Sequence, residues 1–262
     1  MKRTTGAKTG LSSSSHKRVA RGVASAMGAA SSSGSSDKVL HFMRHGTTEM
    51  NVHLGKAKPA YGEPGFQDPG FYDTSLTPAG VKGAKAAAAR VARLAPKPEL
   101  LVVSPLSRAV MTALLAFGER PPCPVVVEPL FRERLYLSSD VGRSPGDLAR
   151  DFPHLSFDHL PDVWWHSDDS DTSGGDGSAS DGGGGGGSSR SRSRSGGEPI
   201  VAEEPDDVFA SRMRAAVEWL EARPERSIAV VSHWGVLFSL TGGTNFENCE
   251  LRSVALSRLT RH

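Results

Sequence analysis

Short, almost uninterrupted apolar runs recur along the chain, and longer stretches with helical spacing of apolar residues separate them. An apolar run of four to eight residues that ends in turn-forming residues is typical of a strand buried on both faces of a sheet. The pattern predicts strands at Lys38–Met43, Leu100–Val103, Pro124–Val127, Ile228–Val231 and Ser253–Leu256.

Two dipeptides between these strands carry helix start signals. Thr77-Pro78 predicts a helix through the Ala-rich stretch that follows, with Thr77 as N-cap and Pro78 in the first helical position. Ser104-Pro105 predicts a second helix in the same way, running to about Phe117.

Three further segments complete the prediction. Pro205–Ala222 has helical spacing, with one apolar stripe formed by Val208, Phe209, Met213, Ala216, Val217 and Leu220. Residues 147–151 are expected to form a helical turn. Residues 44–76, rich in Gly and Pro, are expected to be a loop. Strands that alternate with helices of this length predict an α/β fold of three layers, a largely parallel sheet with helices on both faces.

Two stretches have compositions that do not suit a packed core. Residues 1–36 contain six Lys or Arg, no Asp or Glu, and many Ser, Ala and Gly, and residues 168–197 have no large apolar side chain. Neither can bury enough apolar surface to offset the entropy of ordering. The sequence therefore predicts one domain, 37–262, with a disordered low-complexity insert at 168–197, which contains an Arg-Ser tract.

Residues 1–36 also have the composition of an organelle transit peptide, basic, Ser-rich and free of acidic residues. We expect either a disordered tail or a peptide directing the protein to the chloroplast or mitochondrion. Without such targeting the expected location is cytoplasmic.

Charge and cysteine usage limit the partners. The net charge is +2, and much of the positive excess lies in the first 36 residues, so no nucleic-acid partner is expected. No run of 18 apolar residues is present, so no membrane association is expected. Cys123 and Cys249 are too few for a disulfide framework or a zinc site. The sequence leaves the oligomeric state open.

The first candidate for chemistry is Arg44-His45-Gly46, at the end of the first strand. Neutral imidazole is a competent nucleophile toward phosphorus. An adjacent guanidinium can hold two phosphate oxygens and disfavours the protonated ring. Gly46 would let the backbone approach a ligand. Thr47 and Asn51 could donate to phosphoryl oxygens.

Two later strands end in residues of the same kind. Arg108 follows the strand-ending Ser104 by four positions, where a helix N-terminus also attracts anions. His233 follows Ser232 at the end of the fourth strand and could donate to a phosphoryl oxygen in the transition state. Because the carboxyl ends of parallel strands meet at one edge of the sheet, these side chains should gather there.

A carboxyl group should protonate the leaving group and then activate water. Glu133, after the third strand, is the candidate, with Glu128 and Asp140 as rivals.

The aromatic residues are expected to pack against other side chains. Trp234 is assigned to the core, and Trp164 and Trp165 are assigned to packing rather than to the mouth of a pocket. No metal site is expected, because His41 lies within a strand and no cluster of Cys or carboxylate residues accompanies His41, His45 and His53 at ligand spacing.

At these residues the chain resembles the histidine phosphatase superfamily, also called phosphoglycerate mutase-like. The segments that carry the resemblance are R-H-G-T-T-E-x-N, S-P-L-S-R-A-x-x-T-A and V-S-H-W-G-V, in the family's order. The segments N-C-E-L-R-S-V-A-L and F-R-E-R are more loosely similar to a plant and fungal branch. The resemblance implies a mixed sheet flanked by helices, with no metal or organic cofactor.

The resemblance also implies roles for individual residues. His45 would be the phosphorylated nucleophile, and Arg44, Arg108 and His233 would form the phosphate pocket. Glu133 would be the proton donor, although F-R-E stands where the family has L-x-E. Family members divide into mutases and phosphatases.

The compact core favours a phosphomonoester hydrolase acting on a small phosphorylated metabolite through a phosphohistidine. Positioning of the phosphoryl group decides whether water or product receives it. A phosphoglycerate mutase-type transfer, which the Glu133-Arg134 pair would suit, and a non-catalytic binding module on the same fold remain open. Specificity is expected to lie in residues 53–76 and 134–166.

Overall fold

The central element of the domain is a five-stranded mixed sheet in the order β3-β2-β4-β1-β5. A computed structural model describes residues 37–167 and 203–262. The strands are β1 (Val39–Arg44), β2 (Leu100–Val103), β3 (Val125–Val127), β4 (Ser227–Ser232) and β5 (Leu251–Ala255). All but β5 run parallel, and β5 pairs antiparallel with β1 at the sheet edge.

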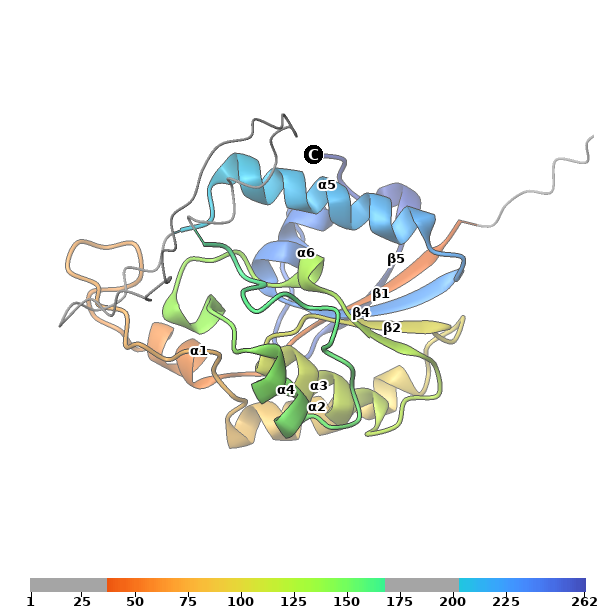
Figure 1. Ribbon diagram of the computed structural model, residues 1–262, viewed down its shortest axis with the longest axis horizontal. Coiled ribbons are helices and arrows are strands. Elements are labelled where there is room, and N and C mark those ends of the chain that lie inside the picture. Colours follow the sequence, from red (N-terminus) through yellow and green to blue (C-terminus); the bar gives the residue numbers. More distant parts are fainter. Residues whose placement is uncertain (1–36, 168–202) are drawn as a thin grey trace, which may run out of the picture. The chain divides into compact units, whose positions relative to one another are not determined.

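Helices cover both faces of the sheet, as the sequence predicts (Figure 1). The helices are α1 (Glu49–Leu54), α2 (Pro78–Val91), α3 (Ser107–Phe117), α4 (Pro145–Asp151), α5 (Asp206–Ala222) and α6 (Trp234–Leu240). Short 3-10 turns lie at Pro129–Phe131, Ser138–Asp140 and Leu256–Arg258.

Alternate residues of each strand supply the two cores, because successive strand side chains point to opposite faces. On one face Phe42 and Val230 pack with residues of α5 and α6, such as Met213 and Leu237. On the other face the buried side of the sheet packs on the small residues of α2 and α3. These include Ala84, Ala87, Ala109 and Ala113. All six residues of β4 are buried, which accounts for its continuous apolar run.

Several predicted boundaries are confirmed. Thr77 caps α2, its side chain accepting the Gly80 N–H, and Pro78 is the first helical residue. The apolar stripe of Pro205–Ala222 becomes α5, with Met213, Ala216, Val217 and Leu220 in the core. The turn at 147–151 is the end of α4.

Three predictions are corrected. Ser104 does not cap α3, because the helix begins only at Ser107, with Leu106 as N-cap. Residues 44–76 are not all loop, because Thr48 and Asn51 form a reciprocal capping box that starts α1. The last strand begins at Leu251, two residues before the predicted start.

Two predictions concern residues that the structure does not describe: the tail at 1–36 and the insert at 168–197 lie outside the described residues. Within the described residues, no helix is both long and apolar enough to span a bilayer.

Candidate active site

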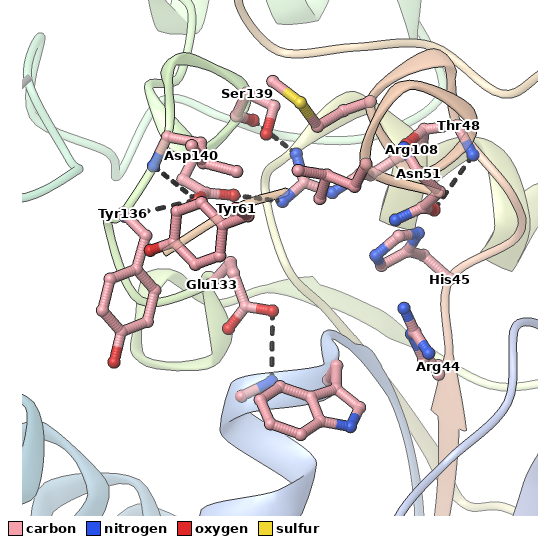
Figure 2. Close-up of a pocket in the computed structure, with 15 residues that line it drawn as sticks. Arg44, His45, Thr48, Asn51, Tyr61, Arg108, Glu133, Tyr136, Ser139 and Asp140 are labelled. Carbon is pink, nitrogen blue, oxygen red and sulfur yellow. Dashed lines mark hydrogen bonds and ion pairs between the residues drawn. The ribbon is translucent and has the colours of Figure 1, made fainter. Parts of the chain in front are cut away.

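The carboxyl ends of the parallel strands converge on a cavity of about 460 Å³. His45 follows β1, Arg108 lies in the first turn of α3 after β2, and Glu133 follows β3. Figure 2 shows these side chains around the cavity. The described residues that line it are Arg44, His45, Thr48, Met50, Asn51, Leu54, Tyr61, Arg108, Glu133, Tyr136, Leu137, Ser139, Asp140, Trp234 and Gly235.

His45 is buried and oriented by its own backbone. Its Nδ1 lies 2.8 Å from the carbonyl oxygen of Gly46, an acceptor that places the ring proton on Nδ1. Among the described residues, none makes a hydrogen bond to Nε2. Burial lowers the pKa of His45 well below its ordinary value, and the charges of Arg108 and Arg44 lower it further. The ring is therefore neutral at neutral pH, with a lone pair on Nε2.

The two arginines of the cavity are held by backbone carbonyls. Arg44 donates from Nη1 to the Phe246 carbonyl at 2.8 Å, and its buried Nε has no partner among the described residues. Arg108 donates from Nη1 to the Ser139 carbonyl and from Nη2 to Asp140 at 2.8 Å. Both guanidinium groups are thus fixed beside His45, where they can meet an anionic ligand.

His233 lies against His45, with ring centroids 5.1 Å apart. It is fully buried and does not line the cavity itself. Its Nε2 lies 2.7 Å from the Ser104 hydroxyl, which accepts the Leu106 N–H at 3.4 Å and so has its own proton to donate. This arrangement favours the tautomer with the proton on Nδ1, a buried atom that has no partner in the described residues. Such an orphaned donor is suited to a phosphoryl oxygen.

Glu133 lines the cavity and lies against the start of α6 (Figure 2). Its carboxylate accepts the N–H of Arg134 at 2.9 Å and the N–H of Gly235 at 3.1 Å. A Cβ at Gly235 would lie 2.6 Å from Glu133 Oε1, so glycine leaves the space that this carboxylate occupies. Burial raises the pKa of Glu133, and the negative charge of Asp140 raises it further, which suits a proton donor.

The two rival carboxyl groups are committed elsewhere. Glu128 accepts the Leu130 N–H at the start of a 3-10 turn and does not line the cavity. Asp140 lines the cavity but binds Arg108 and accepts the N–H of Leu137 at 3.1 Å. Asp140 therefore positions Arg108 rather than standing free for proton transfer.

The structure brings Asn51 to the cavity but not Thr47. The Thr47 carbonyl accepts the Thr77 N–H, and Thr48, the next residue, lines the cavity instead. The predicted role of Gly46 is corrected as well. A Cβ there would lie 2.9 Å from the Gly80 carbonyl, so Gly46 makes room for α2 and not for a ligand.

The assignment of Trp234 to the core is wrong. Its side chain is 42% exposed and lines the cavity, stacked on Phe238. Trp164, by contrast, packs in a satellite core and donates to the Arg143 carbonyl. Tyr61 and Tyr136 also line the cavity. The sequence predicted only that residues 53–76 and 134–166, which contain these two tyrosines, would determine specificity.

Among residues 37–167 and 203–262, no group of three or more His, Cys, Asp or Glu side chains is arranged to hold a metal ion. His41 is enclosed by Ser253, Ser227 and the Pro96 carbonyl. The residues at the cavity fit a phosphate group better than a cation, since two guanidinium groups face it.

A buried neutral imidazole between two arginines, at the carboxyl edge of an α/β sheet, defines an enzyme of phosphoryl transfer. The chain belongs to the histidine phosphatase superfamily (branch 1), whose family model matches residues 40–180. The resemblance that the sequence predicts at the superfamily level is thereby confirmed. The likeness to a plant and fungal branch stays a prediction.

Solved structures with a similar fold include three phosphatases. A putative alpha-ribazole-5'-P phosphatase from Escherichia coli str. K-12 is 19% identical, with 82% of this chain and 89% of that chain covered and a TM-score of 0.46. A mycobacterial glucosyl-3-phosphoglycerate phosphatase is 23% identical, with coverage of 82% and 92% and a TM-score of 0.44. A phosphoserine phosphatase from Entamoeba histolytica is 16% identical, with coverage of 82% and 89% and a TM-score of 0.40. A search of curated proteins finds no match.

Proposed function

We propose that this protein hydrolyses small phosphomonoesters through a phosphohistidine formed on His45, without a metal or organic cofactor. The observation that carries the proposal is the state of His45, a neutral ring with Nδ1 bound to the Gly46 carbonyl and Nε2 unpartnered among the described residues. That ring lies beside two fixed guanidinium groups, which supply the charge that a phosphate needs.

In the first step the Nε2 lone pair attacks phosphorus, and the bond between phosphorus and the ester oxygen breaks. The protonated carboxyl group of Glu133 gives its proton to the departing alkoxide. Arg44, Arg108 and the Nδ1–H of His233 stabilise the charge on the phosphoryl oxygens in the transition state.

In the second step a water oxygen attacks the phosphorus of the phosphohistidine while the Glu133 carboxylate removes a proton from that water. The bond between Nε2 and phosphorus breaks and returns the lone pair to His45. Inorganic phosphate then leaves, and Glu133 is protonated for the next cycle.

The test compares the parent protein with His45→Gln and with His154→Gln, which alters an exposed histidine. In the presence of a chelator, the parent and His154→Gln should release phosphate from simple alkyl and aryl phosphates, and His45→Gln should not. Brief exposure to a labelled ester should leave acid-labile, base-stable label on the parent and on His154→Gln, and none on His45→Gln.

Two outcomes would reject the proposal. An absence of both turnover and labelled protein across a broad panel of esters would favour a binding module on the same fold. Isomerisation of a phosphorylated sugar acid, stimulated by a bisphosphorylated primer and faster than phosphate release, would favour a mutase.

We also propose that residues 1–36 direct the protein to a chloroplast or mitochondrion. The support is compositional, since this stretch is basic and Ser-rich and has no Asp or Glu. A fluorescent protein fused after residue 36 should collect in one organelle, and a uniformly cytoplasmic signal would contradict the proposal.

A further inference from the structure

The cavity has two chemically different ends. Around His45 it is polar and cationic, as the phosphate end requires. At the other end Tyr61 and Tyr136 lie away from His45 and Arg44, toward Glu133 and Asp140 (Figure 2). Apolar side chains of α1, Met50 and Leu54, add to the lining, as do Leu137 and Trp234.

The aromatic lining is held in place by its neighbours. Tyr61 packs edge to face on Phe66, with ring centroids 5.4 Å apart. Trp234 stacks on Phe238 at 4.9 Å and donates from Nε1 to Asn245 at 3.0 Å. Rings fixed in this way present apolar surface without much further loss of side-chain entropy on binding.

This end of the cavity offers no free cation among the described residues. The lining arginines are Arg44 and Arg108, and the second is already paired with Asp140. Arg134, the next guanidinium along the chain, does not line the cavity. It pairs with Asp206 at 2.6 Å and donates to the Glu204 carbonyl at 2.9 Å.

The ionisable groups that do line the cavity beside the aromatic rings are the carboxyl groups of Glu133 and Asp140. A substrate carrying a carboxylate beyond its phosphate would bring that charge toward these acids. Among the described residues, a further guanidinium, that of Arg134, lies 4.7 Å from the centre of the Tyr136 ring, but it is outside the cavity lining and already paired with Asp206. An unpaired charge removed from water is costly.

We propose that the natural substrate is the phosphomonoester of an uncharged, largely apolar alcohol, with an aromatic or similarly flat hydrocarbon group seated between the tyrosines and Trp234. This inference rests on the proposed phosphatase function and specifies its leaving group. A substrate of this kind differs from a phosphorylated sugar acid, which carries a carboxylate in addition to its phosphate.

The test uses four esters of primary alcohols, so that the leaving groups have similar intrinsic reactivity: ethyl phosphate, 2-phenylethyl phosphate, glycerol 3-phosphate and 3-phosphoglycerate. Burial of a phenyl ring should raise kcat/KM for 2-phenylethyl phosphate over ethyl phosphate by about ten- to a hundred-fold. The added carboxylate should make 3-phosphoglycerate a poorer substrate than glycerol 3-phosphate by about ten-fold or more.

A matched pair of variants assigns the preference to the aromatic end. In Tyr61→Ala the ratio of kcat/KM for 2-phenylethyl phosphate to that for ethyl phosphate should fall by about five-fold or more, because ring contact is lost. In Tyr61→Phe, which keeps the ring, the ratio should be retained.

The outcomes separate the two proposals. If phosphate is released but 3-phosphoglycerate equals or exceeds glycerol 3-phosphate, or the phenyl group gives no advantage, the inference about the leaving group is overturned and the phosphatase stands. If none of the four esters is hydrolysed and no phosphohistidine forms, the proposed function itself fails.

Discussion

Single residues at the site are tuned by burial. His45 and His233 are enclosed beside two arginines, and burial is the main reason that the pKa of each ring lies well below its ordinary value. A nucleophilic imidazole benefits, because it keeps its lone pair in mildly acidic solution. The same burial has a cost in stability at low pH.

The sign of that cost follows from proton linkage. Below about pH 6.5 the unfolded chain takes up a proton on each histidine while the folded chain does not. The free energy of unfolding therefore decreases as the pH is lowered. Between pH 6.5 and 5 the slope for each ring approaches about 1.4 kcal/mol per pH unit. Denaturant titrations at several pH values should give a shallower slope for His45→Gln than for the parent. Equal slopes would contradict the burial of a neutral His45.

Gly235 is the second test at the residue scale. A Cβ in Gly235→Ala would lie 2.6 Å from Glu133 Oε1, and the carboxylate must move. Since a general acid contributes about 10²–10⁴-fold, we expect kcat to fall about ten-fold or more. Gly146→Ala, where a Cβ meets no atom within 4 Å, should leave kcat unchanged. If Gly235→Ala has the same kcat as the parent protein, Glu133 is not the proton donor.

At the scale of elements, α5 holds the segment that carries Glu133. Arg212 of α5 donates from Nη1 to the carbonyls of Leu130 and Arg132, both at 2.9 Å. Its other nitrogens bind both carboxylate oxygens of the fully buried Glu204, at 2.8 and 2.6 Å. The buried pair thereby ties the turn after β3 to the helix behind it.

Removal of Arg212 should be severe, because two carbonyl groups lose their donor and, among the described residues, the buried Glu204 carboxylate keeps only its contact with Arg132, at 3.1 Å. Arg212→Met is expected to lower the free energy of unfolding by about 3–5 kcal/mol. The matched control is Arg150→Met, which breaks the exposed Arg150–Asp147 pair and should change it by about 0.5 kcal/mol or less. Chemical denaturation of both variants measures the change in the free energy of unfolding. Similar changes in the two variants would show that the buried Arg212–Glu204 pair does not stabilise the fold.

At the scale of the whole molecule, the phosphate end exists only when β1, β2, β3 and β4 have assembled. A ligand that binds there binds the folded chain alone and stabilises it. Inorganic phosphate at a hundred times its dissociation constant should add about 2.7 kcal/mol, a rise in Tm of about 5–10 °C for a domain of this size. The rise should be lost in Arg44→Met and kept in Arg93→Met, an exposed arginine. A rise retained in Arg44→Met would place the anion elsewhere.

Local signals were sufficient for much of the fold and the phosphate end. Buried parallel strands leave continuous apolar runs, and Thr77-Pro78 marks a helix start with its own chemistry. The motifs around His45, Arg108 and His233 each end a strand, so parallel topology was enough to predict that they meet. The prediction that Ser104 caps a helix was wrong, because Ser-Pro also suits an extended turn. In that turn the Ser104 hydroxyl binds His233 instead of a helix N-terminus.

The remainder depended on contacts between distant residues. Gly235 makes room for Glu133, and Arg108 pairs with Asp140, so these two residues decide which carboxyl group of the cavity is available for proton transfer. They lie 102 and 32 residues from the acids they bind. The exposure of Trp234 depends on the cavity that it lines, which helical periodicity does not encode.

By itself, the sequence determined the class of fold, the order of most strands and helices, and most of the residues that gather around His45, because these follow from short-range patterns and from the shared edge of parallel strands. Tertiary structure alone decided which carboxyl group is free, which threonine of the Thr47-Thr48 pair reaches the cavity, and that the far end is aromatic and without a free cation among the described residues. Those features arise where loops from separate parts of the chain meet, and no local pattern specifies which of their side chains face each other.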